Sequence, residues 1–583
     1  MRKFAAIADL RLSSTVPFRK MAQSSIPFPP EILEKIFACL IVRSCMHIFN
    51  GLEVLKPSSR SDLLACALSS RNFFDPAIRI LWYSVELMPL LKLLPDFKMK
   101  NGTYVCTGKL NDKSLERFDF YSRNVGQLFL RKQDGVSSSD ALTSVSNSAY
   151  NCVALARPRP LPNLTHFYCS AETFHSKAMV FMVSSSLKSA SFYHSIGSEV
   201  IKYLSQVDAK PLQSLTISCR NGGNSYLPSI SQHKNLRSLD LALFHCPAAI
   251  SLDLLPLYCL EHLESLRLDL RNTKLKSSSM QYLSDSLPSP KALKQLRLLV
   301  DHQNVVAAST LLKLYEHSPL EVLHFGVFLE EKQCKAVFSA IPSLWATTLT
   351  TLFINLGGGL IVPRTHTPDS LSSFIAPLYR LRALKEFSIR INGMIGDPFH
   401  LTDTDILKIS EVWPNLTELM LGGIEPQSGC LGRAPTVASL PILARNCPNL
   451  EVLNLPFDVR HVPRINKAKP RIPYSPGSGH KLKHLTLNVL EDDFDICNLA
   501  DRPAMFAYHL DMVFPFLEEV VLARLNYYDV EEEPWDAVNG ILELCLWHHS
   551  SDKIPIVYYR NCEVDRASEH EVFTTIQVYN EYF

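Results

Sequence analysis

Residues that could act as nucleophiles, acids or metal ligands are scattered through this sequence without a known catalytic pattern. The fifteen cysteines include no C-x-x-C pair, and none has a recognisable nucleophile setting. The pairs His548-His549 and His570-Glu571 lack companions at metal-ligand spacing. Three glycines at 357–359 lack the Lys-Ser/Thr partner of a phosphate loop. The sequence therefore predicts no enzyme, no metal site and no cofactor.

Composition and charge narrow the class of protein further. The chain has 583 residues, of which 46% are hydrophobic and 20% charged, with a net charge of +2. These values are typical of a folded chain, and a near-neutral balance argues against nucleic acid as the partner. No apolar stretch approaches the ~20 residues of a membrane span, so no membrane partner is expected. The cysteines are odd in number and scattered along the chain, which predicts reduced thiols in the cytoplasm or nucleus.

A leucine pattern, L-x-x-L-x-L with apolar substitutions, recurs through most of the chain. From Leu164 to Leu517 it takes 12 steps, so the mean period is (517 − 164)/12, or about 29 residues. The first residues of the copies are Val125, Leu164, Leu187, Leu212, Leu236, Leu263, Leu293, Leu320, Leu349, Leu384, Leu416, Leu450, Leu482 and Leu517.

This pattern is similar to a leucine-rich repeat. Its fourth and sixth positions alternate at the strand period and point into a core, while the residue between them faces the other way. Helical patterns lie between the strands, as at 200–204, 311–315, 406–409 and 437–447. The predicted fold is an α/β solenoid, a horseshoe with parallel strands inside and helices outside, preceded by a small helical module.

The residue between the fourth and sixth positions is expected on the concave face, where a target protein would bind. In chain order these residues are Phe129, Tyr168, Ser191, Thr216, Asp240, Arg267, Arg297, His324, Phe353, Ser388, Met420, Asn454, Thr486 and Val521. Asp240, Arg267, Arg297, His324 and Phe353 form the predicted target site, and its two arginines suit an acidic or phosphorylated segment. These side chains could instead be merely solvated. The basic segment Arg460 to Lys483 is the next candidate.

The N-terminal segment 26–86 predicts three short helices. Pro29 and Pro30 begin the first helix, which carries Ile32, Ile36 and Leu40 at spacing i, i+4 and i+8. Ser61 or Asp62 is expected to cap the second helix, and Ile78, Leu81 and Trp82 lie on the third. A module this small cannot bury all of its apolar surface, so it needs a partner.

The same segment resembles an F-box. It matches that pattern at Pro29, Glu31, Ile32, Ile36, Phe37, Leu40, Asp62, Leu63, Leu64, Leu68, Ser69, Phe73, Leu81 and Trp82. The stretch LLACALSSRNFFDPAIRILW is particularly similar to F-box proteins of basidiomycete fungi. The spacer 41–60 is longer than in the family and could lengthen the first helix or loop out.

The resemblance implies a substrate receptor of an SCF (Skp, cullin, F-box) ubiquitin ligase. The implied partners are a Skp-type adaptor, a cullin reached through it, and an unknown target protein. The implied adaptor contacts are Pro29, Ile32, Ile36, Leu40, Leu63, Leu64 and Trp82, each of which could instead pack inside the module; for Phe37 and Leu68 we expect that packing. Two alternatives stay open, namely a scaffold without a role in ubiquitination and a cysteine-dependent ligase.

Five segments complete the expected organisation. A basic arm covers 1–25, the F-box 26–86, a linker or N-terminal cap 87–122, the leucine-rich repeats 123–525 and a C-terminal cap 526–583. This basic, acid-poor arm could be a mitochondrial transit peptide, but we expect a disordered tail, and translation could begin at Met21. The cap is expected because a solenoid must cover its terminal core.

Overall fold

A computed structural model describes residues 29–561 with gaps. It leaves out 1–28, 40–42, 47–51, 109, 131–143, 171–175, 194–197, 207–211, 219–225, 244–250, 272–273, 276–289, 301–304, 328–330, 358–368, 392–398, 423–433, 459–479, 490–508, 511–512, 515, 525–557 and 562–583. The expected arm 1–25, most of the basic segment 460–483 and most of the expected cap 526–583 therefore lie outside the described residues. The described chain divides into two compact units, with the boundary after Asp240.

The first unit opens with a three-helix module. Its helices are α2 (Pro30–Cys39), α3 (Pro57–Ser69) and α4 (Arg71–Tyr83), and both α2 and α3 pack against α4. The Phe37 and Phe73 rings meet edge to face, with centroids 5.6 Å apart. Arg79 on α4 pairs with Glu34 on α2 at 2.9 Å. These contacts hold the first helix against the third.

The long spacer neither lengthens the first helix nor simply loops out. It contains an antiparallel pair of strands, β1 (Arg43–Met46) and β2 (Leu52–Leu55). The second helix then begins at Pro57, earlier than the expected caps Ser61 and Asp62, because proline suits a first helical turn. The hairpin and the earlier helix start use most of the extra length between the first two helices.

The module is joined directly to the repeats of the first unit. Helix α4 runs into strand β3 (Ser84–Glu86), and the Trp82 ring packs 4.4 Å from the Tyr121 ring on α6 (Asp112–Ser122). Gly126 donates its N–H to the Tyr83 carbonyl, and a Cβ there would lie 2.2 Å from the Tyr83 ring. The parallel sheet therefore starts within the expected F-box segment, ahead of residue 123.

Parallel strands and short helices alternate through the rest of the first unit. The strands β3, β6, β8, β9 and β10 are hydrogen-bonded in that order, and β11 (Ser238–Ala242) follows β10 at the unit boundary. Three further strands, β4 (Phe97–Lys100), β5 (Thr103–Cys106) and β7 (Ser144–Val145), form a separate small sheet. In the chain, β4 and β5 lie between β3 and β6, and β7 lies between β6 and β8. The other elements are β6 (Gln127–Leu130), β8 (His166–Cys169), β9 (Ser189–Tyr193), β10 (Ser214–Ser218), α5 (Leu87–Leu91), α7 (Asn147–Ala156), η2 (Ser176–Met182), α8 (Ser198–Gln206) and α9 (Leu227–Ile230).

The second unit repeats the same arrangement. Its parallel strands are β13 (Ser265–Asp269), β15 (Gln295–Val300), β16 (Val322–Val327), β17 (Thr351–Leu356), β19 (Glu386–Ile391), β21 (Glu418–Gly422), β22 (Val452–Phe457), β23 (His484–Val489), β24 (Glu519–Arg524) and β25 (Tyr558–Asn561). Its helices are η3 (Leu255–Cys259), α11 (Val305–Leu314), α12 (Glu331–Trp345), α13 (Leu371–Ile375), η5 (Ala376–Arg380), α14 (Asp403–Val412) and α15 (Ser439–Asn446).

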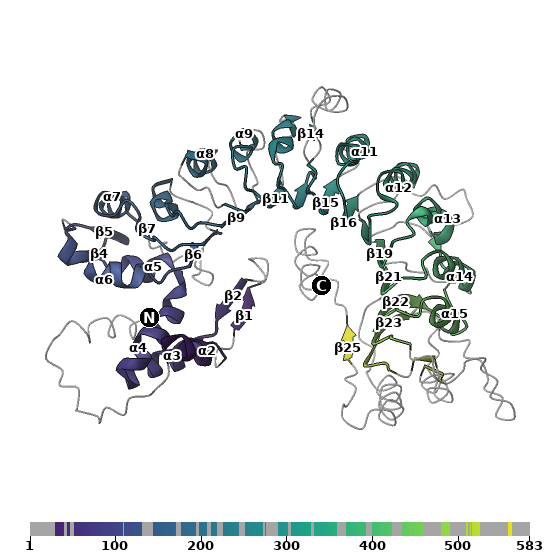
Figure 1. The fold of residues 1–583 in the computed structure, drawn as a ribbon, viewed down its shortest axis with the longest axis horizontal. Coiled ribbons are helices and arrows are strands. Elements are labelled where there is room, and N and C mark those ends of the chain that lie inside the picture. The colour runs from purple at the N-terminus through teal and green to yellow at the C-terminus, as the bar shows by residue number, and fades with distance from the viewer. Residues whose placement is uncertain are drawn as a thin grey trace. The chain divides into compact units, whose positions relative to one another are not determined.

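In this unit the helices α11, α12, α14 and α15 lie along one side of the strands (Figure 1). Two-stranded pairs, β12 (Ser251–Leu252) with β14 (Lys274–Leu275) and β18 (Asp369–Ser370) with β20 (Phe399–His400), are formed by residues between the main strands. The predicted alternation of parallel strands with helices is confirmed in each unit.

The leucine pattern forms the core of each repeat. Leu323, Leu352, Phe387 and Leu419 are register partners on successive strands, and each is fully buried. Burying a leucine or phenylalanine side chain contributes about 1.5–3 kcal/mol, so every repeat adds its own share of core. Because alternate residues of a strand face opposite sides, the residues between these positions face away from the helices.

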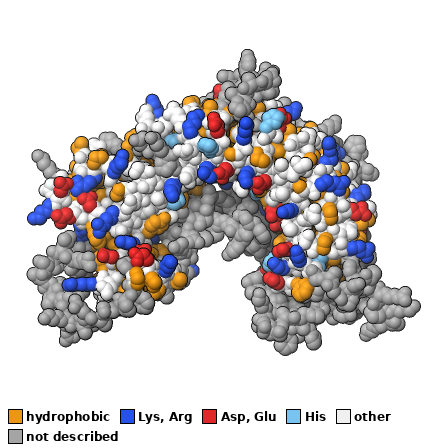
Figure 2. Space-filling view, in the orientation of Figure 1, with side chains coloured by type: hydrophobic (Ala, Val, Ile, Leu, Met, Phe, Trp, Pro, Cys, Tyr) orange, Lys and Arg blue, Asp and Glu red, His pale blue; other side chains and the backbone are white. Residues whose placement is uncertain are grey.

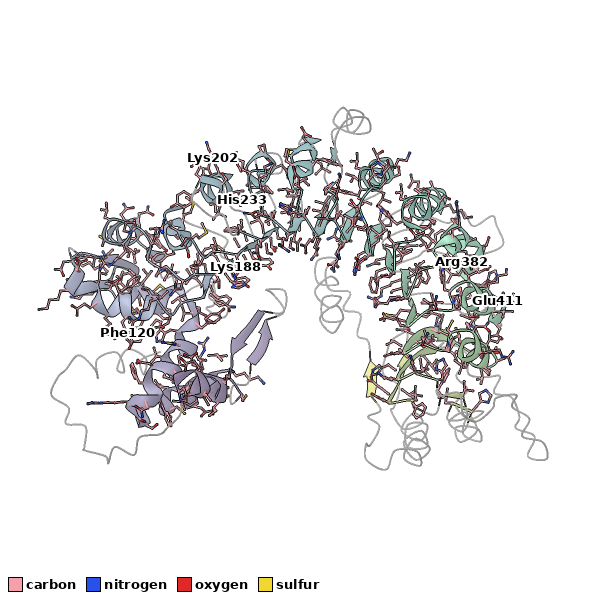
Figure 3. The ribbon with its side chains drawn as sticks, viewed as in Figure 1. Phe120, Lys188, Lys202, His233, Arg382 and Glu411 are labelled. Atoms are coloured by element: carbon pink, nitrogen blue, oxygen red, sulfur yellow. The ribbon has the colours of Figure 1, made fainter. Side chains whose placement is uncertain are left out.

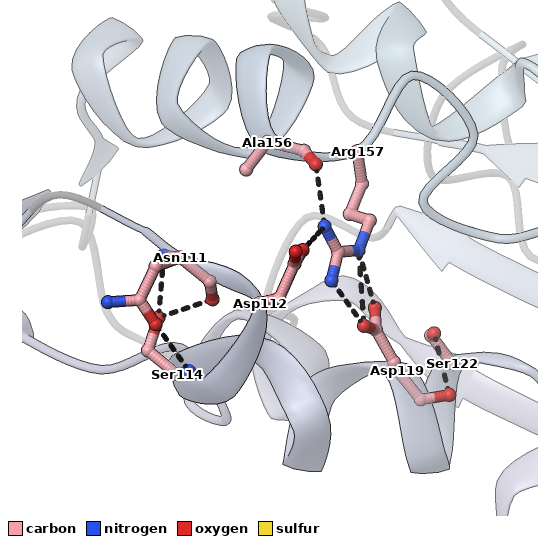
Figure 4. A network of polar contacts seen from close by, with 7 residues as sticks. All are labelled: Asn111, Asp112, Ser114, Asp119, Ser122, Ala156 and Arg157. Atoms are coloured by element: carbon pink, nitrogen blue, oxygen red, sulfur yellow. Dashed lines mark hydrogen bonds and ion pairs between the residues drawn. The ribbon is translucent and has the colours of Figure 1, made fainter.

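An ion-pair network ties the first repeats of the first unit together (Figure 4). Arg157, just after α7, donates from Nη2 to Asp119 at 2.7 Å and from Nη1 to Asp112 at 2.8 Å, both on α6. Asn111 and Ser114 close the start of α6 as a capping box. The forked guanidinium matches two carboxylates at once, so the network holds α6 and α7 in one arrangement.

This network predicts a measurable difference between arginine and lysine at position 157. Arg157→Lys keeps the charge but cannot reach both carboxylates, so we expect a loss of about 1 kcal/mol in the free energy of unfolding. Arg159→Lys, at an exposed residue two positions away, is the matched control and should leave stability unchanged. Urea denaturation measures the free energy of unfolding of each variant. Equal denaturation midpoints for the two variants would contradict the expectation.

Candidate interaction surfaces

The first candidate surface is an apolar face on the three-helix module. Ile32 and Ile36 on α2 are 44% and 41% exposed, and Leu68 on α3 is 46% exposed. Leu33 and Phe37, on the other side of α2, are buried. Apolar side chains are visible on the surface of this module in the space-filling view (Figure 2). Large exposed apolar residues on a small module indicate a protein-contact surface.

The expected adaptor-contact residues do not all lie on this face. Pro29 is exposed, whereas Leu63 is buried inside the module and Leu64 is half-buried. Trp82 is half-buried, with its ring against Tyr121 of the first repeats. Leu40 lies outside the described residues.

Two further expectations concerned packing inside the module. Phe37 does pack inside, as expected. The same expectation for Leu68 is wrong, because Leu68 is 46% exposed.

The second candidate surface is the helix-free face of the parallel sheet. The predicted row of residues between the core positions is confirmed by the strand register: Arg267, Arg297, His324, Phe353, Ser388, Met420, Asn454, Thr486 and Val521 are successive partners in the second unit. Neighbouring strands lie about 4.8 Å apart, so these residues form one continuous line. Arg382 and Glu411, by contrast, lie on the helical side (Figure 3).

Arginine side chains dominate one end of this line. Arg267 and Arg297 are register partners on β13 and β15, and His324 follows on β16. Burial, together with the charges of Arg297 and Arg267, lowers the pKa of His324 to about 4, so this imidazole is neutral near pH 7. Its ring stacks on Phe353 with centroids 4.4 Å apart. This end of the line therefore places two arginines beside a neutral, stacked histidine.

The structure divides the predicted target site between the two units. Asp240 on β11 belongs to the first unit, whereas Arg267, Arg297, His324 and Phe353 lie together in the second. In the first unit the corresponding line begins with Phe129 and Tyr168, whose rings stack 5.2 Å apart.

A pair of glutamates lies on the helix-free side of the sheet, which is the open face, and was missed by the sequence analysis. Glu386 on β19 and Glu418 on β21 are register partners. Each lies two residues before a residue of the predicted line, and the period of two places it on the same face. Burial, together with the charge of Glu386, raises the pKa of Glu418 to about 7. Extending the line to the position two residues earlier would have revealed both.

Metal and membrane sites were also sought. The described residues contain no group of three or more His, Cys, Asp or Glu side chains placed to hold a metal ion. Within the same residues, every helix is too short or too polar to cross a membrane. Of the cysteines that the structure describes, Cys106, Cys169, Cys334 and Cys447 are buried, and these four form no disulfide.

Comparison with known proteins assigns no family to this chain. No family model matches the chain, and no curated protein matches it. Among solved structures, the leucine-rich repeat domain of APL1 is similar at 12% identity, covering 82% of this chain and 90% of that one, with a TM-score of 0.25. The leucine-rich repeat description of this chain therefore depends on its own strands, register and buried leucines.

The raised pKa of Glu418 predicts a pH-dependent stability. The folded chain holds a proton on Glu418 up to about pH 7, whereas an unfolded glutamic acid loses it near pH 4.3. Wild-type stability therefore falls between about pH 5 and pH 8 because of this residue. Glu418→Gln removes this dependence, so its stability relative to wild type should rise by about 1–3 kcal/mol over that range.

Chemical denaturation at pH 5 and pH 8 measures that difference. Glu411→Gln, on the exposed surface of α14, is the control and should follow the wild type at both values. A Glu418→Gln variant whose pH dependence matches the wild type would contradict the assignment of a proton to this carboxyl.

Proposed function

We propose that this chain is the substrate-recognition subunit of an SCF-type ubiquitin ligase. In this proposal the N-terminal module binds a Skp-type adaptor, and through it a cullin, while the open face of the repeats binds a target protein. The chain itself has no catalytic role, and the complex works in the cytoplasm or nucleus. Ubiquitin chemistry is performed by the other subunits.

The observation that carries this proposal is the exposed pair Ile32 and Ile36 on a module fixed to the repeats. Both side chains are more than 40% exposed, at spacing i and i+4 on one helix face. The Trp82–Tyr121 ring contact and the β3–β6 pairing join the module to the repeats without a flexible linker. A receptor needs such a connection, because it must hold its target at a fixed position relative to the adaptor.

The resemblance of residues 26–86 to an F-box supplies the identity of the partner. The two alternatives, a scaffold without ubiquitination and a cysteine-dependent ligase, make different predictions about the complex. Co-purification of a Skp-type adaptor supports either F-box role, and a cullin in the same complex supports the receptor over the scaffold. Ubiquitin transfer by the isolated chain would support the ligase instead.

The exposed face of α2 predicts a specific loss of adaptor binding. Ile32→Asp combined with Ile36→Asp places two carboxylates in the proposed contact, where burying an unpaired charge costs several kcal/mol. Both positions are exposed in the free chain, so folding should be little affected. We expect at least a hundredfold weaker binding to a purified Skp-type adaptor, measured by calorimetry.

Leu155→Asp is the matched control for this experiment. Leu155 on α7 is 87% exposed, so the same chemical change is made at an apolar residue outside the module. It should leave adaptor binding unchanged. Full adaptor binding by the Ile32→Asp, Ile36→Asp variant would refute the F-box assignment.

The arginine end of the open face predicts a separate effect on target capture. Arg267→Ala combined with Arg297→Ala removes two adjacent positive charges, so the set of captured proteins with acidic or phosphorylated segments should shrink while adaptor binding persists. Arg380→Ala with Arg382→Ala, at exposed positions around η5, is the control. Quantitative mass spectrometry of affinity-purified complexes measures the change, and an unaltered set would move target recognition to another surface.

A further inference from the structure

The carboxyl pair Glu386 and Glu418 is built into the open face of the second unit. The two residues face each other across the β19–β21 register, about 4.8 Å apart along the sheet. Glu418 is only 7% exposed, although it lies on the helix-free side. The backbone therefore holds the two carboxyl groups close together.

The hydrogen bonds of the pair are incomplete. The Thr351 hydroxyl on β17 donates to Glu386 Oε2 at 3.1 Å. The buried Glu418 Oε1 has no hydrogen-bond partner among the described residues. A buried oxygen without a donor costs about 1–3 kcal/mol, and more when it is charged, so an added hydrogen-bond donor would stabilise this site.

The charged groups that flank the pair leave it uncompensated. On β22 the next residue of the row is Val452, and on β23 it is His484, which pairs with Glu519 at 3.0 Å. Arg390 lies four residues along β19, too far to pair with Glu386 in an extended strand. Among the described residues, neither carboxyl forms an ion pair.

We propose that Glu386 and Glu418 form a binding site for a lysine or arginine side chain of the target protein. This inference depends on the proposed role of the open face in target binding. An ammonium or guanidinium group supplies several N–H donors for the unpartnered oxygen of Glu418, and its positive charge stabilises both carboxyl groups in their ionised form. Met420 and Val452, both half-buried beside the pair, suit the aliphatic stem of such a side chain.

A divalent metal ion fits this site less well. Calcium takes six to eight oxygen ligands and magnesium demands an octahedral set, whereas only two carboxyl groups and one hydroxyl converge here. A basic side chain needs no such set. The ligand class is therefore an extended basic segment rather than an ion.

The spacing from the arginine pair limits the target further. Glu386 on β19 lies three strands away from Arg297 on β15 and two residues earlier along the strand, or about 16 Å at the usual strand and residue spacings. An extended segment advances about 3.3 Å per residue, so an acidic or phosphorylated residue and a basic residue about five positions apart would reach both sites. The open face would then recognise opposite charges in a fixed order.

Proton release accompanies the proposed binding. Below about pH 7 Glu418 holds a proton on its carboxyl group, and a bound cation displaces that proton to solvent. Binding of the basic segment should therefore tighten as the pH rises from 6 to 8. Thr351 on β17 and Val452 on β22 flank the pair, Ser388 and Met420 follow on its own strands, and none of these four side chains titrates in this range. His484 lies one strand further on and pairs with Glu519.

The test uses the full-length chain and a phage-displayed library of random dodecapeptides as the probe. We expect selection to enrich peptides with a lysine or arginine at a constant distance from an acidic residue. A synthetic copy of the enriched peptide should bind at least tenfold more weakly to the Glu386→Gln, Glu418→Gln variant, and binding to Glu411→Gln should match the wild type. Calorimetry in buffers of different ionisation enthalpy should show proton release at pH 6.5.

Three results would overturn the inference: no peptide enriched, enriched peptides without a basic residue, or full binding by the Glu386→Gln, Glu418→Gln variant. Adaptor binding is measured in parallel on the same variant. Retained adaptor binding with any of these results rejects the carboxyl site but leaves the F-box assignment standing. Loss of binding only in the arginine variant, Arg267→Ala with Arg297→Ala, would show that the open face binds its target without this pair.

Discussion

Burial of one apolar strand face under a row of helices is the constraint from which the other features follow. Each repeat is too small to enclose a core alone, so its leucines are buried only when the neighbouring repeat supplies the adjoining strand and helix. Leu323, Leu352 and Phe387 are fully buried for this reason. The parallel register is a consequence, because it brings the same position of every repeat into one line.

The core requirement also divides the residues of each strand into two groups with different freedom. Positions such as Leu352 and Ile354 must be apolar, whereas Phe353 between them and Thr351 before it face away from the helices. The strand positions that can carry charged side chains are therefore those on the open face, where the register places arginine beside arginine and glutamate beside glutamate. Placing two arginines or two carboxyl groups side by side does not stabilise a fold, and the cost of this placement is consistent with a role in recognition.

The N-terminal module obeys the same constraint at a smaller scale. Leu33, Phe37 and Leu63 form its interior, and the Trp82 ring is covered by Tyr121 of the first repeats. The apolar residues left over, Ile32, Ile36 and Leu68, are those that the module cannot cover. Fusion of α4 to strand β3 thus uses one end of the module for the repeats and leaves another face for a partner.

The sequence by itself determined the repeat, the buried leucines and the line of open-face residues that runs from Arg267 to Thr486. Alternate residues of a strand face opposite sides of the sheet, so the side that each residue faces can be assigned without knowledge of the fold. It also located the three helices of the module. Only the tertiary structure decided that the spacer forms a hairpin, that Leu68 is exposed while Leu63 is buried, and that Trp82 packs on Tyr121. These outcomes depend on which elements meet in space. The environment of Glu418 was equally hidden, because its pKa is raised first by its burial and then by the charge of Glu386, a residue 32 positions earlier that only strand pairing brings beside it.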